Sequence, residues 1–291
     1  MPNNKTLSWI LLGLISLIWG SSFILIKKGL LFFTPSEVGT LRIFMASLAL
    51  LPFGIQAIRR VPRRKRTYIF IVGLVGSYIP AMLFALAQTR VDSAITGVIN
   101  SFTPIFVTLF GILFFQLKMT RTASFGIVIG LIGCLFILLG GAHFDMRGIN
   151  YYGFLILAAT VMYGINANII KSFLPEIKAL DITALSFFLI FPICASVLFF
   201  GTGFTAKIST NPNFLWAFGY IAVLGVIGTA LAMFIFNKLV KIASPVFATS
   251  CTYIIPLVAI GWGLLDGETL NIYQYLGIVI VLMGVYLANR K

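Results

Sequence analysis

The sequence predicts an all-α polytopic membrane protein with ten transmembrane helices, arranged as two inverted repeats of five helices. Three observations support this fold class. The 291 residues are 60% hydrophobic and only 10% charged, with a mean hydropathy of +1.06, whereas soluble domains are about 25% charged. Apolar runs of spanning length recur along the whole chain, and the second half repeats motifs of the first. The composition excludes the soluble globular, disordered and disulfide-rich classes.

Ten apolar runs are long enough to cross a bilayer, which requires about 20 mostly apolar residues. They occupy residues 8–31, 37–57, 68–88, 93–115, 122–141, 151–173, 182–201, 214–237, 245–265 and 272–289. The runs are too continuous for a transmembrane β-barrel, which shows alternating segments of about ten residues. We therefore expect ten helices joined by short connections.

The basic residues predict how these helices are oriented. The net charge is +14, which in a soluble chain would suggest nucleic acid binding. With the N-terminus in the cytoplasm, 15 of the 21 Lys and Arg residues fall on the cytoplasmic side, six of them within residues 59–66. Cytoplasmic loops of membrane proteins are enriched in Lys and Arg. We predict that both termini are cytoplasmic and that the charge marks orientation rather than a nucleic acid partner.

The two halves of the chain resemble each other. Residues 19–27 and 163–171 share an aromatic residue followed by glycine and a lysine at the end, and residues 126–129 recur as 277–280. Pro104 matches Pro256. We divide the chain into a first repeat, 1–144, and a second repeat, 145–291. Since five spans are an odd number, the second repeat enters the membrane from the opposite side, a construction common in secondary transporters.

Four segments carry a resemblance to a known family. They are residues 19–23 (Trp-Gly-Ser-Ser-Phe), Leu41-Arg42 after Pro35, residues 100–106 (Asn-Ser-Phe-Thr-Pro-Ile-Phe), and residues 267–270 (Gly-Glu-Thr-Leu) followed by Gly277. Together and in this order, the motifs resemble the EamA family of the drug/metabolite transporter superfamily over nearly the whole chain.

The resemblance implies a ten-helix transporter of the cytoplasmic (inner) membrane that exports metabolites such as amino acids. The chain departs from the family pattern once, because the first repeat has Leu117 at the position that matches Glu268. This difference weakens a role for Glu268 in ion coupling.

Arg42 is the one full charge that we place inside a predicted span. Charged residues at membrane depth are costly and commonly functional. One interpretation is a site for a substrate carboxylate, which a guanidinium binds with two hydrogen bonds. The other is a structural arginine that pairs with Glu37 or with backbone carbonyls.

Other polar and aromatic residues at mid-depth predict a substrate cavity. Asn100 precedes the helix-breaking Pro104, and Thr252 and Tyr253 precede Pro256 in the same way. Trp19 and Ser22 match Tyr163 and Asn166, and Tyr78 lies near Pro80. The predicted substrate-binding residues are Trp19, Ser22, Arg42, Tyr78, Asn100, Tyr163, Asn166, Thr252 and Tyr253, with Pro80, Pro104 and Pro256 as hinges. The alternative for each is helix packing or interhelical hydrogen bonding.

We predict a secondary transporter that moves a small metabolite by alternating access. The alternatives are a flippase for lipids or lipid-linked sugars and a solute channel. No catalytic, metal or cofactor site is expected, because the chain has one histidine and three scattered cysteines. The expected partners are a small-molecule substrate and membrane lipids. A monomer is favoured because one chain holds both repeats, with a homodimer as the alternative.

Overall fold

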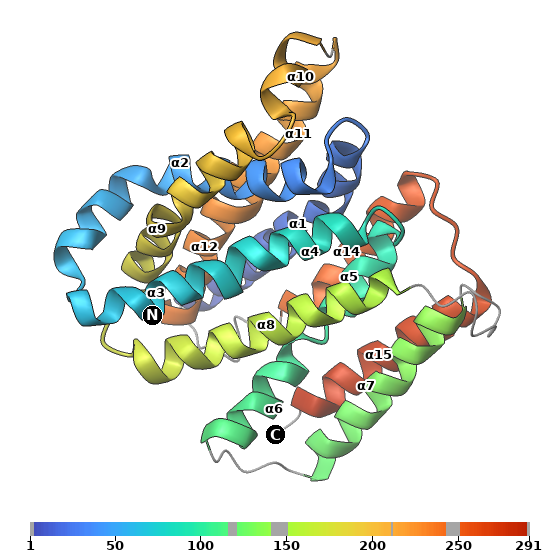
Figure 1. The fold of residues 1–291 in the computed structure, drawn as a ribbon. Coiled ribbons are helices and arrows are strands. Elements are labelled where there is room, and N and C mark those ends of the chain that lie inside the picture. The colour runs from blue at the N-terminus through green and yellow to red at the C-terminus, as the bar shows by residue number, and fades with distance from the viewer. Residues whose placement is uncertain (1–2, 116–120, 141–150, 211, 243–250, 290–291) are drawn as a thin grey trace.

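A computed structural model describes residues 3–115, 121–140, 151–210, 212–242 and 251–289, and these residues form helices and loops without strands (Figure 1). The first half contains α1 (Asn3–Leu30), α2 (Pro35–Arg60), α3 (Arg63–Gly73), the π-helix η1 (Leu74–Tyr78), α4 (Ile79–Ala87), α5 (Ser93–Asn100), α6 (Thr103–Phe115) and α7 (Arg121–Gly140). The second half contains α8 (Tyr152–Phe173), α9 (Ala179–Phe200), α10 (Phe204–Thr210), α11 (Phe214–Gly225), the π-helix η3 (Val226–Leu231), α12 (Ala232–Ile242), α14 (Cys251–Leu265) and α15 (Ile272–Asn289).

The helices confirm a polytopic membrane protein. Seven continuous helical stretches of the described chain are long and apolar enough to cross a membrane. Three shorter apolar helices cover Val128–Ile137, Ile254–Leu265 and Ile272–Gly284. Each falls within one of the ten predicted runs, although the start of the ninth run lies outside the described residues. The count of ten spans and the cytoplasmic position of both termini remain predictions. The short helix α10 lies in a connection where no element was predicted.

Three of the spans are not regular α-helices. The third and the eighth contain the π-helices η1 and η3 at matching positions of the two halves. The fourth is interrupted by a turn at Ser101 and Phe102, after which Pro104 occupies the first turn of α6. Proline is tolerated there because first-turn N–H groups have no helical acceptor. π-Helical turns are rare and frequently lie at functional sites.

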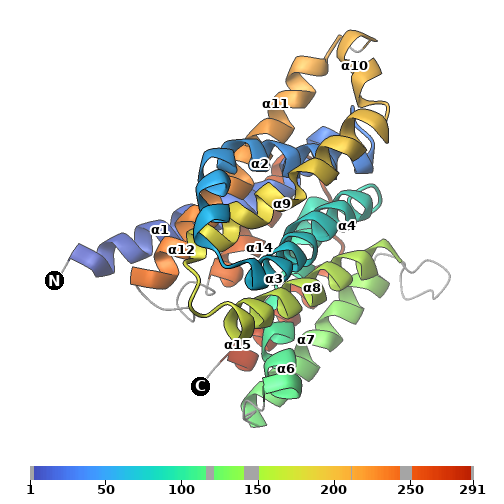
Figure 2. The ribbon, with the colours of Figure 1, turned by 60° about the vertical axis from the view of Figure 1, so that its left-hand side comes forward.

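The two halves pack against each other through matching pairs of helices (Figures 1 and 2). α1 of the first half contacts α14 of the second, and in the corresponding pair α8 contacts α6. α2 contacts α9, and α7 contacts α15, so these equivalent helices pair with each other. The largest hydrophobic core draws on both halves. The centre of the protein therefore lies between the halves.

Glycines allow α7 and α15 to approach closely. A Cβ added at Gly284 would overlap the backbone of Gly130, and one added at Gly133 would lie 2.6 Å from the backbone nitrogen of Val281. Gly130 and Gly133 of α7 thus form a seam of small residues that packs against α15. Such seams are a common means of helix association in membranes.

Gly284→Ala is expected to destabilise the protein by about 1–3 kcal/mol, because overpacking a tight contact forces backbone shifts. Unfolding by denaturant in detergent micelles measures this change. Gly261→Ala is the matched control, since a Cβ at Gly261 meets nothing within 4 Å. Equal stability of the two variants would contradict the close contact.

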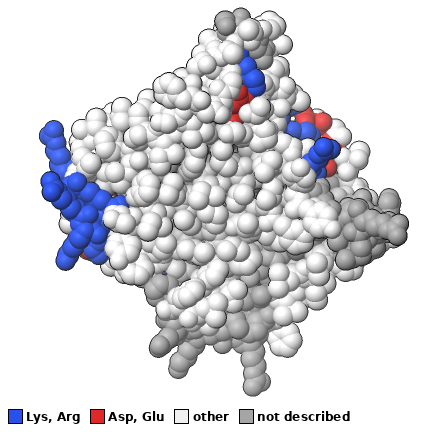
Figure 3. All heavy atoms as spheres, in the orientation of Figure 1, with Lys and Arg blue, Asp and Glu red and all other residues white. Residues whose placement is uncertain are grey.

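Charged residues gather at two opposite ends of the molecule, with an apolar band between them (Figure 3). One end is strongly basic and lies where α2 meets α3, which places residues 59–66 there. The other end mixes acidic and basic side chains. This distribution is the one expected of helices that cross a bilayer between two aqueous sides.

Candidate functional site

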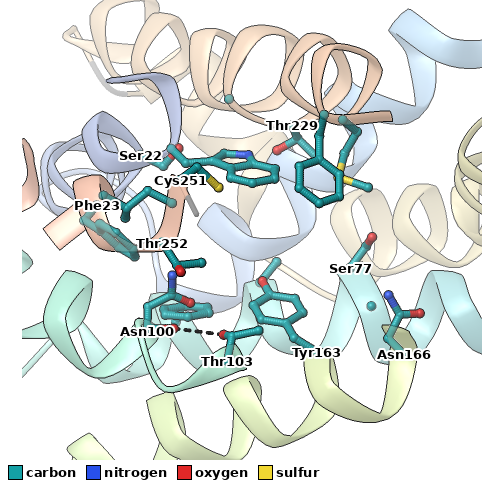
Figure 4. Close-up of a pocket in the computed structure, with 18 of the residues that line it drawn as sticks. Ser22, Phe23, Ser77, Asn100, Thr103, Tyr163, Asn166, Thr229, Cys251 and Thr252 are labelled. Atoms are coloured by element: carbon teal, nitrogen blue, oxygen red, sulfur yellow. Dashed lines mark hydrogen bonds between the residues drawn. The ribbon is translucent and has the colours of Figure 1, made fainter. Parts of the chain in front are cut away.

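A cavity of about 270 Å³ lies between the two halves (Figure 4). Its walls come from α1, α2, η1, α4, α5 and α6 of the first half and from α8, η3, α12 and α14 of the second. Its volume is at the lower end for ligand pockets, which span about 300–1,000 Å³. The cavity therefore suits a small solute.

Seven of the nine residues predicted to bind substrate line this cavity. They are Trp19, Ser22, Arg42, Asn100, Tyr163, Asn166 and Thr252. The structure does not bring Tyr78 to the cavity; its half-buried side chain packs against a separate core cluster that includes Ile43 and Phe187. The side chain of Tyr253 lies outside the described part of the structure. Of the predicted hinges, Pro80 is buried in the first turn of α4, next to η1, and Pro256 lies within α14.

The cavity has two matching aromatic pairs, each formed between the halves. Trp19 of α1 packs against Phe236 of α12, with ring centroids 5.4 Å apart. Tyr163 of α8 packs against Phe84 of α4 at 6.1 Å. Trp19 matches Tyr163 in the repeat, so the same contact is made twice. The aromatic rings give the cavity two apolar walls.

The two π-helices contribute to the cavity, which the sequence motifs did not predict. Gly76 and Ser77 of η1, and Gly228 and Thr229 of η3, all line the cavity. A Cβ at Gly76 would lie 2.5 Å from the amide of Asn166, and one at Gly228 would lie 3.1 Å from the Oγ of Ser22. The recurrence of a glycine followed by a hydroxyl residue, 152 positions apart, is the signal in the sequence that could have identified them.

Arg42 makes a contact that the sequence did not predict. Its Nε donates a hydrogen bond to the Oγ1 of Thr229, at 2.9 Å, and so joins α2 to η3. The alternative in which Arg42 pairs with Glu37 is wrong, because Glu37 accepts a hydrogen bond from Lys207 at 2.6 Å. Glu37 also closes the capping box of α2 with Thr34. Glu37 forms the capping box because it lies in the first turn of α2, where a carboxylate binds the free N–H groups of the helix N-terminus.

Asn100 ends α5 at the break in the fourth span. Figure 4 shows the side chain of Asn100 pointing toward Thr252 of α14. The backbone carbonyl of Asn100 accepts a hydrogen bond from the Oγ1 of Thr103 at 2.9 Å. Across the cavity, the Oδ1 of Asn166 is buried and has no hydrogen-bond partner in the described structure. A buried unpaired acceptor costs free energy, so a donor on a bound solute would be favourable there.

Beyond the cavity, a buried carboxylate links the halves at the mixed-charge end. Glu268 binds the Nζ of Lys27 at 2.8 Å and accepts hydrogen bonds from the backbone N–H groups of Ser93 and Ala94 at 2.9 and 3.0 Å. It thereby satisfies the N-terminus of α5, whose N-cap residue Asp92 makes no side-chain capping bond. Its counterpart Leu117 lies outside the described residues.

Two neighbouring acids have shifted pKa values. Hydrogen bonds from Lys28 and Lys27 lower the pKa of Asp266. Burial raises the pKa of Asp92, and the nearby charge of Glu268 adds to this shift. Asp266 and Glu268 are therefore ion-pair partners of Lys27, and neither they nor Asp92 line the cavity.

Ion pairs also link the halves at the basic end. Arg60, at the end of α2, binds Asp181 in the first turn of α9 at 3.2 Å. Lys65 binds Glu176 at 2.8 Å, and its hydrogen bond lowers the pKa of that carboxyl. The cavity is thus bracketed at each end by ion pairs that cross from one half to the other.

Proteins that are similar to this chain over most of its length are named as transporters. An uncharacterized transporter of Archaeoglobus fulgidus is 24% identical over 97% of this chain and 99% of its own. The Escherichia coli inner membrane transporter YedA, also uncharacterized, is 28% identical over 94% of this chain and 87% of its own. The S-adenosylmethionine/S-adenosylhomocysteine transporter of Chlamydia trachomatis is 25% identical over 89% of this chain and 82% of its own.

A solved crystal structure shares the fold, with a TM-score of 0.61 at 14% identity over 97% of this chain and 96% of the other. The sequence profile of the EamA-like transporter family matches twice, at residues 7–139 and 151–290. The family and the named relatives are transporters, which makes this chain a multi-pass membrane transport protein rather than an enzyme. The chain belongs to the EamA-like transporter family.

Proposed function

We propose that the protein is a secondary transporter that exports a small metabolite, such as an amino acid, across the cytoplasmic membrane by alternating access. The observation that carries the proposal is the cavity between the halves, to which both halves contribute matching aromatic and polar side chains. Secondary transporters bind substrate near the bilayer midplane between their repeats.

The ion pairs at the two ends give alternating access a physical basis. Lys27–Glu268 and Lys207–Glu37 cross between the halves at one end, and Arg60–Asp181 and Lys65–Glu176 cross at the other. Opening the cavity to one side requires breaking the pairs of that end only. The two inverted repeats, with boundaries at 144 and 145, would rock about the central cavity, and a single chain would suffice.

The proposal is tested by flux of labelled solutes in proteoliposomes, with a panel of amino acids, organic acids and nucleosides. We expect saturable flux of at least one solute. Flux that does not saturate would favour a channel, whereas movement of labelled lipids without solute flux would favour a flippase. Absence of solute flux across the panel would contradict the proposal.

Asn100→Ala is expected to lower the efficiency of flux about tenfold, since a hydrogen bond to a buried polar group contributes on the order of 1 kcal/mol or more. Initial rates over a range of solute concentrations measure the effect. Asn213→Ala is the matched control, because Asn213 is exposed in the connection before α11. Unchanged flux of a well-folded Asn100→Ala protein would remove Asn100 from the site.

A further inference from the structure

We propose that the cavity selects a solute that carries one carboxylate on a small apolar body, and that Arg42 binds this carboxylate. The inference rests on the proposed function, because it names the substrate class of the same cavity. Within the proposed class of small metabolites, the site would recognise net negative charge and would therefore bind a simple carboxylate in preference to the zwitterionic form of an amino acid.

The charged side chains around the cavity do not balance one another among the described residues. Among the described residues that line it, Arg42 is the one ionised side chain, and Asp, Glu and Lys do not contribute. In the part of the chain that the structure describes, no carboxylate lies within ion-pair distance of Arg42. The nearby acid of α2, Glu37, is already held by Lys207. The cavity therefore has a net positive charge that the described residues do not balance.

The position of Arg42 makes this imbalance costly. Arg42 is seven residues from the start of α2, or about 10 Å along the helix axis at 1.5 Å per residue. The hydrocarbon core is about 30 Å thick, so the guanidinium lies well inside the span. An unpaired charge at that depth is unfavourable and marks a functional site by default. A bound anion would supply the missing counter-charge.

The hydrogen bond that Arg42 makes within the protein uses its Nε, so the N–H groups of its two Nη atoms are available to bind a carboxylate. A guanidinium has five N–H donors, one on Nε and four on the two Nη atoms. The Nε donates to Thr229, and this bond fixes the plane of the group. The Nη atoms can then donate two parallel hydrogen bonds to a planar carboxylate. Figure 4 shows Thr229 and Tyr163 on facing walls of the cavity, which Arg42 also lines.

The repeat limits the solute to one carboxylate. Ser186 occupies the position in α9 that matches Arg42, and its hydroxyl donates to the backbone carbonyl of Thr183 at 2.8 Å. The second half therefore contributes no equivalent cation. The remaining walls are the aromatic pairs Trp19–Phe236 and Phe84–Tyr163, which suit a ring or a branched apolar group. An ammonium group could donate to the unpaired Oδ1 of Asn166, but it would meet no carboxylate to balance its charge among the described lining residues.

Thermal unfolding of the purified protein with matched ligands tests the inference, because a ligand that binds the folded state raises the melting temperature. Three series are used, each with a carboxylate, its neutral amide and, where it exists, the α-amino acid. They are 3-phenylpropanoate with 3-phenylpropanamide and phenylalanine, benzoate with benzamide, and 4-methylpentanoate with 4-methylpentanamide and leucine.

We expect at least one carboxylate to bind about tenfold or more tightly than its amide and its amino acid, which is the effect of a charge-assisted hydrogen-bonded pair. Arg42→Gln should abolish this preference, and Arg42→Lys should retain part of it, because lysine keeps the charge without the two-pronged geometry. Arg59→Gln is the control for charge and helix, since Arg59 is exposed near the end of α2. The Arg59→Gln protein should prefer carboxylates over amides and amino acids to the same degree as the wild type.

The inference is overturned if amides or amino acids bind as tightly as carboxylates in every series, or if Arg42→Gln keeps the preference. Because binding is measured without a membrane, these outcomes are separate from failure of the proposed function. Selective carboxylate binding without flux would support this site and contradict transport. Saturable flux of neutral solutes that is unaffected by Arg42→Gln would support transport and contradict this site.

Discussion

Glu268→Ala is expected to lower the free energy of unfolding by about 3 kcal/mol. The Glu268 side chain is 2% exposed and holds Lys27 together with two backbone N–H groups of α5. Removing one partner of a buried ion pair costs about 3–5 kcal/mol. The lower end of this range applies, because the Lys27 side chain is 31% exposed and can regain contact with water. Denaturant unfolding in detergent micelles measures the change.

Two further variants separate the causes of this loss. Glu268→Gln removes the charge but keeps an oxygen that can accept from the N-terminus of α5, so its stability should be intermediate. Glu176→Ala removes an acid from a more exposed pair, since the Glu176 side chain is 49% exposed, and should cost much less. A Glu268→Ala protein as stable as Glu176→Ala would show that the buried carboxylate does not hold the halves together.

Gly76→Leu is expected to eliminate most of the saturable flux, by at least about a hundredfold, while the protein still folds. Gly76 borders the cavity, and a Cβ there already approaches the amide of Asn166 to 2.5 Å. A leucine side chain would enter the space of the solute and displace Asn166. A displacement of about 1 Å in a positioning residue can reduce rates about a hundredfold. Initial flux rates in proteoliposomes, together with the melting temperature, test this result.

Gly13→Leu is the matched control for this variant. It introduces the same side chain into α1, where a Cβ meets nothing within 4 Å. We expect Gly13→Leu to transport as the wild type does. The milder Gly228→Ala, whose Cβ would lie 3.1 Å from the Oγ of Ser22, should reduce flux less than Gly76→Leu. Full flux in Gly76→Leu would mean that the solute does not pass through this cavity.

The candidate site could be predicted from the sequence where the repeat placed two matching residues at the same depth, and at Arg42, where a charge falls inside an apolar span. Trp19 with Tyr163, and Ser22 with Asn166, were identified in this way, and all four line the cavity. Tyr78 was selected by its proximity to Pro80, but the neighbouring Ser77 lines the cavity instead. Adjacent residues of a helix point in different directions, and the π-helix η1 changes the direction further.

The sequence by itself determined the membrane class and the positions of the apolar helices, because these depend on the length and hydropathy of local segments. It also indicated the family, because the motifs at residues 19–23, 41–42, 100–106 and 267–270 can be identified without the fold. Only the tertiary structure decided the partners of the charged side chains. Arg42 binds Thr229, 187 positions away, and Glu37 binds Lys207 rather than Arg42. These pairs form between the two halves, so they depend on how distant helices pack. Hydropathy sets which segments enter the membrane, whereas contacts across the halves set which side chains meet there.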